Sequence, residues 1–107
     1  VVSHGSTTTN NPLRQAYGCG ACSGNPGHPN ARLYALLANR PAVRERLREA
    51  GVDVPEGTLF VPYFHDTTLD EVELLDAALL PPERSEEVRA LSERLRSAAR
   101  ENAVERC

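Results

Sequence analysis

The chain has 107 residues, of which 40% are hydrophobic and 25% are charged, and its formal net charge is -3. This length suits one small domain, and the acidic balance argues against a nucleic-acid partner, which requires a basic face. No apolar run approaches the roughly 20 residues of a membrane span, and Val1-Val2-Ser3-His4 shows no basic signal-peptide start. The three cysteines are an odd number, which favours a reducing intracellular compartment over a disulfide scaffold.

Both ends of the chain predict a cut within a longer protein. The first residue is not Met and precedes what reads as the end of a strand at Val2, while Cys107 ends a helical pattern. We therefore expect residues 1–107 to be one fragment of a larger intracellular α/β domain. Its expected parts are a His/Cys metal loop over 1–30, a helical pair over 31–51, a strand and polar loop over 58–76, and a long helix over 84–107.

A glycine-rich loop is expected near the start of the chain. Residues 5–30 hold five of the seven glycines together with Pro12, Pro26 and Pro29, and this is the chemistry of turns. A loop of that length within a compact domain is usually functional.

Three helices are expected after this loop. Asn30 is a suitable N-cap for a helix over about 31–39, whose leucines recur at helical spacing. Pro41 predicts the first turn of a second helix, which runs to about Ala50. Ser85 is followed by two glutamates and begins a long helix with apolar residues at helical spacing.

The second half of the chain contains the clearest strand signal. Residues 58–64 form a nearly continuous apolar run, which is typical of a strand in a sheet that is covered on both faces. Pro62 argues against a central position for this strand, because proline has no amide donor. Residues 72–75 fit either a second short strand or a helical turn.

Two polar segments are expected to converge at one edge of the sheet. The segments that start at His4 and at His65 each follow a predicted strand. If the strand ending at Val2 and the strand 58–64 are parallel, both segments leave the carboxyl edge, where α/β proteins build their sites. Asp66 could orient the neighbouring imidazole for proton transfer. Alternatively, Asp66 bonds backbone amides at the opening of a loop.

His4, Cys19 and Cys22 are candidate zinc ligands, because zinc takes imidazole nitrogen and thiolate sulfur. Their spacing is not that of a zinc finger or ribbon, so a turn-capping His and two small buried cysteines fit it as well. A redox pair is a further alternative for Cys19 and Cys22. It is disfavoured because the glycine- and proline-rich residues that follow cannot form the helix on which such pairs depend. His28 is expected in an exposed loop.

Five short motifs stand in order along the chain, namely His4-Gly5-Ser6-Thr7, Asn10-Asn11-Pro12, Cys19-Gly20-Ala21-Cys22, Pro29-Asn30-Ala31-Arg32 and His65-Asp66-Thr67-Thr68-Leu69-Asp70-Glu71. In order and spacing they jointly resemble the DabA family of probable inorganic carbon transporter subunits. The resemblance covers nearly the whole chain and depends on the joint occurrence of the motifs.

The resemblance implies a fold and a zinc site. The family's core is similar to a β-type carbonic anhydrase with a Rossmann-like sheet, in which two Cys, one His and one Asp hold zinc. His4 and Cys19 match the His and the second Cys of that set. The other Cys and the Asp are expected upstream of this chain. Cys22 is outside the set and would lie beside the site or be buried.

The resemblance also implies an activity and partners. The parent protein is expected to hydrate CO2 to bicarbonate at the cytoplasmic side of the bacterial inner membrane, together with a DabB-like membrane subunit that translocates cations. His65 and Asp66 are candidates for moving the proton. The isolated fragment is expected to be inactive, because two ligands cannot hold zinc as four do. A structural zinc module with no open coordination position stays an alternative.

Overall fold

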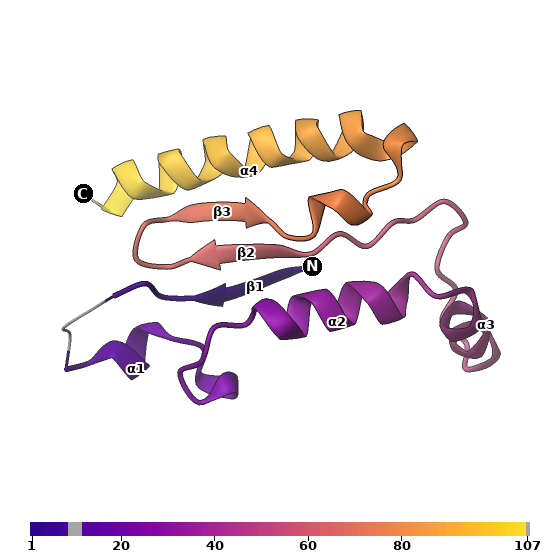
Figure 1. Ribbon diagram of the computed structural model, residues 1–107, viewed down its shortest axis with the longest axis horizontal. Helices are drawn as coiled ribbons and strands as arrows, with labels where there is room; N and C mark the ends of the chain where they lie inside the picture. Colours follow the sequence, from indigo (N-terminus) through magenta and orange to yellow (C-terminus); the bar gives the residue numbers. More distant parts are fainter. Residues whose placement is uncertain (9–11, 107) are drawn as a thin grey trace.

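The computed structural model describes residues 1–8 and 12–106, so Asn10, Asn11 and Cys107 lie outside the described residues. Three strands and four α-helices follow one another in this part of the chain (Figure 1). In chain order they are β1 (Val2–Gly5), α1 (Arg14–Tyr17), α2 (His28–Ala38), α3 (Pro41–Glu49), β2 (Tyr63–Asp66), β3 (Glu71–Leu74) and α4 (Ser85–Arg106). The α/β class predicted from the sequence is confirmed.

The strands form one sheet in the order β1-β2-β3. β1 and β2 are parallel, as predicted, and their register pairs Val2 with Tyr63 and Gly5 with Asp66. β3 returns antiparallel to β2, which settles the alternatives for residues 72–75 in favour of a strand. The described sheet is therefore mixed, and the β-carbonic-anhydrase-like sheet stays a prediction.

Helices cover both faces of the sheet. Neighbouring residues of β2 point to opposite faces, and the apolar side chains on each face pack against a different helix. Tyr63 packs with Val61 and with Val88 of α4, and its hydroxyl lies 2.8 Å from Ser92 Oγ. Phe64 packs with Ala31 of α2 and with Leu75 on the opposite face. In Figure 1, α4 runs along β3 and α2 runs along β1, so the three strands lie between the two helices.

Both strands of the parallel pair end later than predicted, and β2 also begins later. β1 runs on to Gly5 instead of ending at Val2, and β2 covers Tyr63–Asp66 instead of 58–64. The early part of the apolar run has other partners. Asn39 Nδ2 donates to Phe60 O at 2.7 Å, and Asn39 Oδ1 accepts from Phe60 N at 2.8 Å. These two bonds satisfy the Phe60 backbone as a strand neighbour would.

The three predicted helices agree with the structure except at the start of α2. That helix begins at His28 with Pro29 in its first turn, a position that suits proline because its missing amide would be unpaired there. The prediction of Asn30 as the N-cap was therefore wrong. The prediction of His28 as exposed loop was also wrong, since its ring stacks on Phe64 with centroids 3.6 Å apart. Short helical turns also interrupt the predicted loop, at α1 and at Gly20–Cys22.

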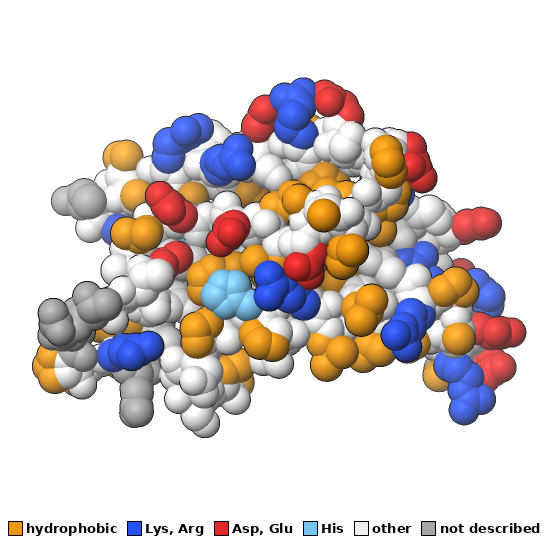
Figure 2. Space-filling view, in the orientation of Figure 1, with side chains coloured by type: hydrophobic (Ala, Val, Ile, Leu, Met, Phe, Trp, Pro, Cys, Tyr) orange, Lys and Arg blue, Asp and Glu red, His pale blue; other side chains and the backbone are white. Residues whose placement is uncertain are grey.

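The surface separates charged from apolar regions. Figure 2 shows acidic and basic side chains over α4 and α3, with hydrophobic side chains gathered between them beside α2. Leu33, Leu36 and Leu79 are each more than half exposed and line a groove of about 580 Å³. None of the described helices combines the length and the apolar character that a membrane crossing requires.

Candidate functional site

The two histidines that were expected to converge are neighbours in the sheet. His4 and His65 are Cα partners in the parallel register of β1 and β2. Paired residues of adjacent strands point to the same face, so the two side chains leave the sheet on one side. Both residues lie within their strands, as the third residue of β1 and the third of β2. The prediction that they open loops after the strands was therefore wrong, while the prediction that they lie close together is confirmed.

The cysteine loop is joined to β1 at His4. The amide of Gly27 donates to the His4 carbonyl oxygen at 3.0 Å. A Cβ atom at Gly27 would lie 2.8 Å from Ser3 Cβ and 3.1 Å from the His4 oxygen, so only glycine permits this approach. As a result, His4, Cys19 and Cys22 all line one pocket of about 310 Å³ beside β1.

Cys19 and Cys22 form a hydrogen-bonded pair of free thiols. The Cys22 amide donates to the Cys19 carbonyl oxygen at 3.1 Å, which closes a helical turn over Gly20–Cys22. The side-chain hydrogen bond from Cys22 lowers the pKa of Cys19, and the same contact raises the pKa of Cys22. Asn30 Nδ2, in the first turn of α2, donates to Cys22 Sγ at 3.0 Å. Cys19 is therefore the sulfur that ionises more readily, and the thiolate is the form that binds metals.

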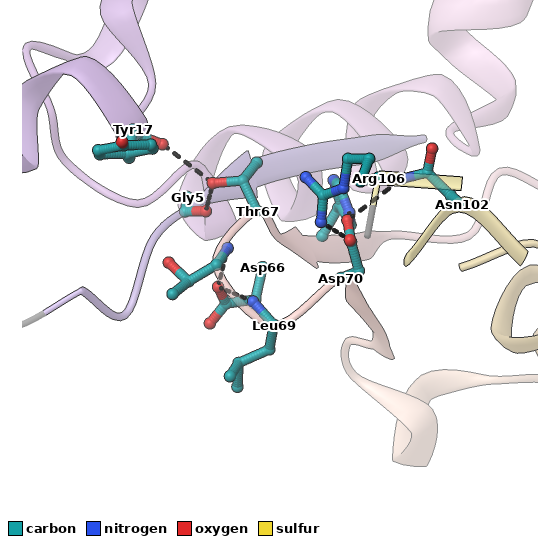
Figure 3. Close-up of polar contacts among 10 residues, drawn as sticks. Gly5, Tyr17, Asp66, Thr67, Leu69, Asp70, Asn102 and Arg106 are labelled. Atoms are coloured by element: carbon teal, nitrogen blue, oxygen red, sulfur yellow. Dashed lines mark hydrogen bonds and ion pairs between the residues drawn. The ribbon is translucent and has the colours of Figure 1, made fainter. Parts of the chain in front are cut away.

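Asp66 does not contact the neighbouring imidazole, because consecutive strand residues point to opposite faces. Its Oδ1 accepts from the amides of Thr68 at 2.8 Å and Leu69 at 3.3 Å (Figure 3). Burial of Asp66 raises its pKa, but hydrogen bonds from Thr7 and from these amides outweigh that effect, so the net pKa is lowered. This geometry corresponds to the alternative in which Asp66 bonds backbone amides.

The carboxylate that contacts His65 belongs to Asp70. Asp70 Oδ1 lies 3.3 Å from His65 Nε2 across the turn between β2 and β3, and the Asp70 side chain is only 3% exposed. Figure 3 shows two residues of α4 on the same carboxylate. Asn102 Nδ2 donates to Asp70 Oδ1 at 3.4 Å, and Arg106 forms an ion pair with Oδ2. In the sequence, Asp70 stands out only as part of a motif, and its contact with His65 was not predicted.

Hydroxyl groups connect the ends of the two parallel strands. Thr67 Oγ1 donates to the Gly5 carbonyl oxygen at 2.8 Å and contacts the Tyr17 carbonyl oxygen at 3.0 Å (Figure 3). Ser6 Oγ lies 2.8 Å from Thr68 Oγ1. The segments after His4 and His65 therefore meet at the carboxyl edge of the sheet, as the parallel arrangement predicted.

The described residues hold no group of three or more His, Cys, Asp or Glu side chains placed to bind a metal ion. Two of the predicted ligands, His4 and Cys19, share the pocket beside β1, and Asp66 and Asp70 are occupied by other contacts. Two residues that shape the site were not predicted, namely Asn30 on Cys22 and Asp70 on His65. Asp70 has a positive φ of 55°, a conformation in which Asp and Asn are enriched. The Asp at this position was therefore a sequence signal for a tight turn after β2.

Comparison with known proteins identifies relatives along the whole chain. The family model described as "Probable inorganic carbon transporter subunit DabA" matches residues 1–107. A DabA 1 protein of Nitrobacter winogradskyi is 50% identical over 106 residues, and a DabA 2 protein of Sorangium cellulosum is 46% identical over 107 residues. A DabA protein of Thiobacillus denitrificans is 48% identical over 106 residues.

These alignments cover 99% or 100% of this chain but only 10% of the length of each of the three relatives. The chain thus corresponds to about a tenth of those proteins. No solved structure matches it. The match of the family model over the full length, together with these identities, shows that the chain belongs to the DabA family, whose model is described as that of a probable inorganic carbon transporter subunit.

Proposed function

We propose that this chain supplies His4 and Cys19 as two of the four ligands of a zinc ion in an inorganic carbon transporter subunit. The remaining Cys and Asp ligands are expected from another part of the same polypeptide. The observation that carries the proposal is the shared pocket, since His4 of β1 and Cys19 of the following loop both line it. Imidazole nitrogen and thiolate sulfur are the ligand types that zinc prefers.

The donor atoms of this pocket suit zinc. The hydrogen bond from Cys22 lowers the pKa of Cys19 and so favours the thiolate. Asn30 holds Cys22 in turn. Residues that hydrogen-bond a metal ligand without touching the metal are a regular part of metal sites, and their loss typically weakens metal binding or activity by about 10–100-fold. This supports Cys22 as a residue that positions a ligand.

The reaction that we propose for the parent protein is hydration of CO2 to bicarbonate. Zinc, when bound, would supply a Lewis acid that makes water nucleophilic at neutral pH. Hydration releases a proton, and His65 is suited to carry it away. The imidazole shares a sheet face with His4, is partly exposed, and is held by the buried Asp70 carboxylate. Imidazole groups that are held in place in this way are common carriers of protons in enzymes.

Uptake of inorganic carbon requires more than the hydration step. The relatives are named as transporter subunits, which supports work within a complex. We propose a DabB-like membrane subunit that translocates cations as the partner, and a peripheral position at the cytoplasmic side of the bacterial inner membrane. Coupling to a cation gradient would let the parent protein hydrate CO2 in one direction.

Zinc content of the parent protein tests this proposal. Two of the three histidines of the chain, His4 and His65, provide matched variants. His4→Ala should abolish bound zinc, as should Cys19→Ala, whereas His65→Ala should keep zinc and lower the rate of CO2 hydration. Elemental analysis and stopped-flow hydration assays measure the two properties. Full zinc occupancy in His4→Ala or Cys19→Ala would show that the ligands lie elsewhere.

A further inference from the structure

Cys19 and Cys22 have a second chemistry available besides metal binding. The backbone hydrogen bond from Cys22 N to Cys19 O closes a turn of four residues, and such a turn keeps its first and last Cα atoms within about 7 Å. Disulfides bridge Cα atoms that are roughly 4.4–6.8 Å apart. The backbone therefore already holds the two cysteines at the separation that a disulfide needs.

The side chains of the two cysteines also lie within contact of each other. Cys19 directly precedes the short 3₁₀ turn that ends at Cys22. The two thiols are hydrogen-bonded to each other. Asn30 Nδ2 fixes Cys22 Sγ from the helix α2. Both sulfurs are free, half-buried and border an open pocket, so a soluble oxidant can reach them.

We propose that Cys19 and Cys22 form a reversible disulfide that removes Cys19 from the zinc ligands and so makes the site sensitive to oxidation. This inference rests on the proposed role of Cys19 as a ligand. One sulfur cannot be both a zinc thiolate and half of a disulfide. The pair therefore has two exclusive states, a reduced state that binds metal and an oxidised state that does not.

The oxidant is a small-molecule disulfide such as oxidised glutathione. Cys19 attacks one sulfur of the oxidant, which breaks its S–S bond, forms a mixed disulfide and releases the first thiol. Cys22 then attacks Cys19 Sγ, which forms the internal S–S bond and releases the second thiol. Two electrons pass from the cysteine pair to the oxidant, and the two protein thiol protons end on the two released thiols.

The experiment uses the full-length parent protein loaded with zinc and treated with oxidised glutathione. Both cysteines lie in one tryptic peptide, residues 15–32, so mass spectrometry detects the internal disulfide as a loss of about two hydrogen masses. A chromogenic chelator records released zinc in the same samples. We expect one zinc ion released per disulfide formed, and restoration of zinc binding after reduction with dithiothreitol.

Cys22→Ser is the matched variant, because it keeps the proposed ligand Cys19 and removes the second sulfur. It should form no internal disulfide and should release zinc at least about tenfold more slowly, since the tethered thiol is absent. Glutathione adducts on the wild-type peptide without an internal disulfide would overturn the inference, as would a disulfide that forms while zinc stays bound. A reduced wild-type protein that binds no zinc but forms the disulfide would instead overturn the proposed function.

Discussion

Asp70 and His65 face each other across the turn between β2 and β3, with Oδ1 and Nε2 3.3 Å apart. The same carboxylate binds Arg106 near the end of α4. One buried acid thus joins the sheet to the last turn of a helix that begins at Ser85. It also fixes the ring of a histidine that neighbours His4.

The first prediction concerns replacement of Asp70 in the parent protein. Asp70→Asn removes the charge that pairs with Arg106 but keeps a side chain that tolerates the φ of 55°. Because Arg106 is about half exposed, we expect a loss of only about 1–2 kcal/mol of local stability. Amide exchange of residues 67–70 and of the end of α4 should then become about 5–30-fold faster.

Two further variants separate the causes of that effect. Asp70→Ala loses the carboxylate and also the tolerance for positive φ, so its amides should exchange faster than those of Asp70→Asn. Glu71→Gln changes an exposed neighbouring acid and should leave exchange unchanged. Equal protection in wild type and Asp70→Ala would contradict the proposed connection between turn and helix.

The second prediction uses two glycines of the cysteine loop. A methyl group at Gly27 would collide with Ser3 and with the His4 carbonyl oxygen, so Gly27→Ala should push the loop away from β1. If the pocket holds zinc, affinity should fall by about 10–100-fold, as for other changes that displace ligands. Gly20→Ala is the control, since nothing lies within 4 Å of the added atom. Competition with a zinc chelator measures both variants, and equal affinities would refute the role of this contact.

The third prediction is a dependence on pH at Asp66. Hydrogen bonds lower its pKa in the folded chain below the ordinary value of 3.8. The stabilisation by its carboxylate is therefore complete above pH 3.8 and is lost as the pH falls through the lower, folded value. Amide exchange of residues 67–69, corrected for intrinsic rates, should accelerate over that acidic range. Asp66→Asn should remove most of this pH dependence. Amide protection of residues 67–69 that stays constant in the wild-type protein over the same pH range would contradict the prediction.

The fourth prediction distinguishes the two cysteines. Cys19→Ala should abolish zinc binding by the parent protein, while Cys22→Ala should retain zinc with at most a 10–100-fold loss of affinity. The reason is that Cys22 contacts Cys19 and Asn30 and is proposed to act through Cys19. Elemental analysis of both variants decides the point. Loss of zinc in Cys22→Ala would favour a structural site with two thiolates from this loop.

Sequence patterns predicted the helices well because their signals are local. Pro41 and Ser85 begin α3 and α4 where expected, since proline and a polar residue followed by acids both suit a first turn. The position of β2 could not be read in this way. The residues that β2 can include depend on which backbone N–H and C=O groups of the apolar run are still free to bond a neighbouring strand. The side chain of Asn39, twenty-one residues before Phe60, bonds both backbone groups of Phe60.

The site was predicted in its broad position but not in its contacts. Two parallel strands had to bring His4 and His65 to one edge of the sheet, and they do. The partner of His65 could not be found from its sequence neighbour Asp66, because strand alternation separates those two side chains. Asp70 reaches the imidazole only through the turn at positive φ, and Arg106 reaches Asp70 only because α4 packs along β3.

The parallel pairing of β1 with β2 also bears on how the pocket comes into existence during folding. Ser3 Oγ bonds the carbonyl oxygen of Tyr63 across 60 positions of the chain, and closing a loop of that length costs about 3–4 kcal/mol of entropy. A synthetic peptide of residues 1–30 would contain His4 and Cys19 but not the strand that aligns β1. Binding of the proposed zinc ion should thus be a late event, which would follow docking of the two halves of the chain and would then stabilise the docked state.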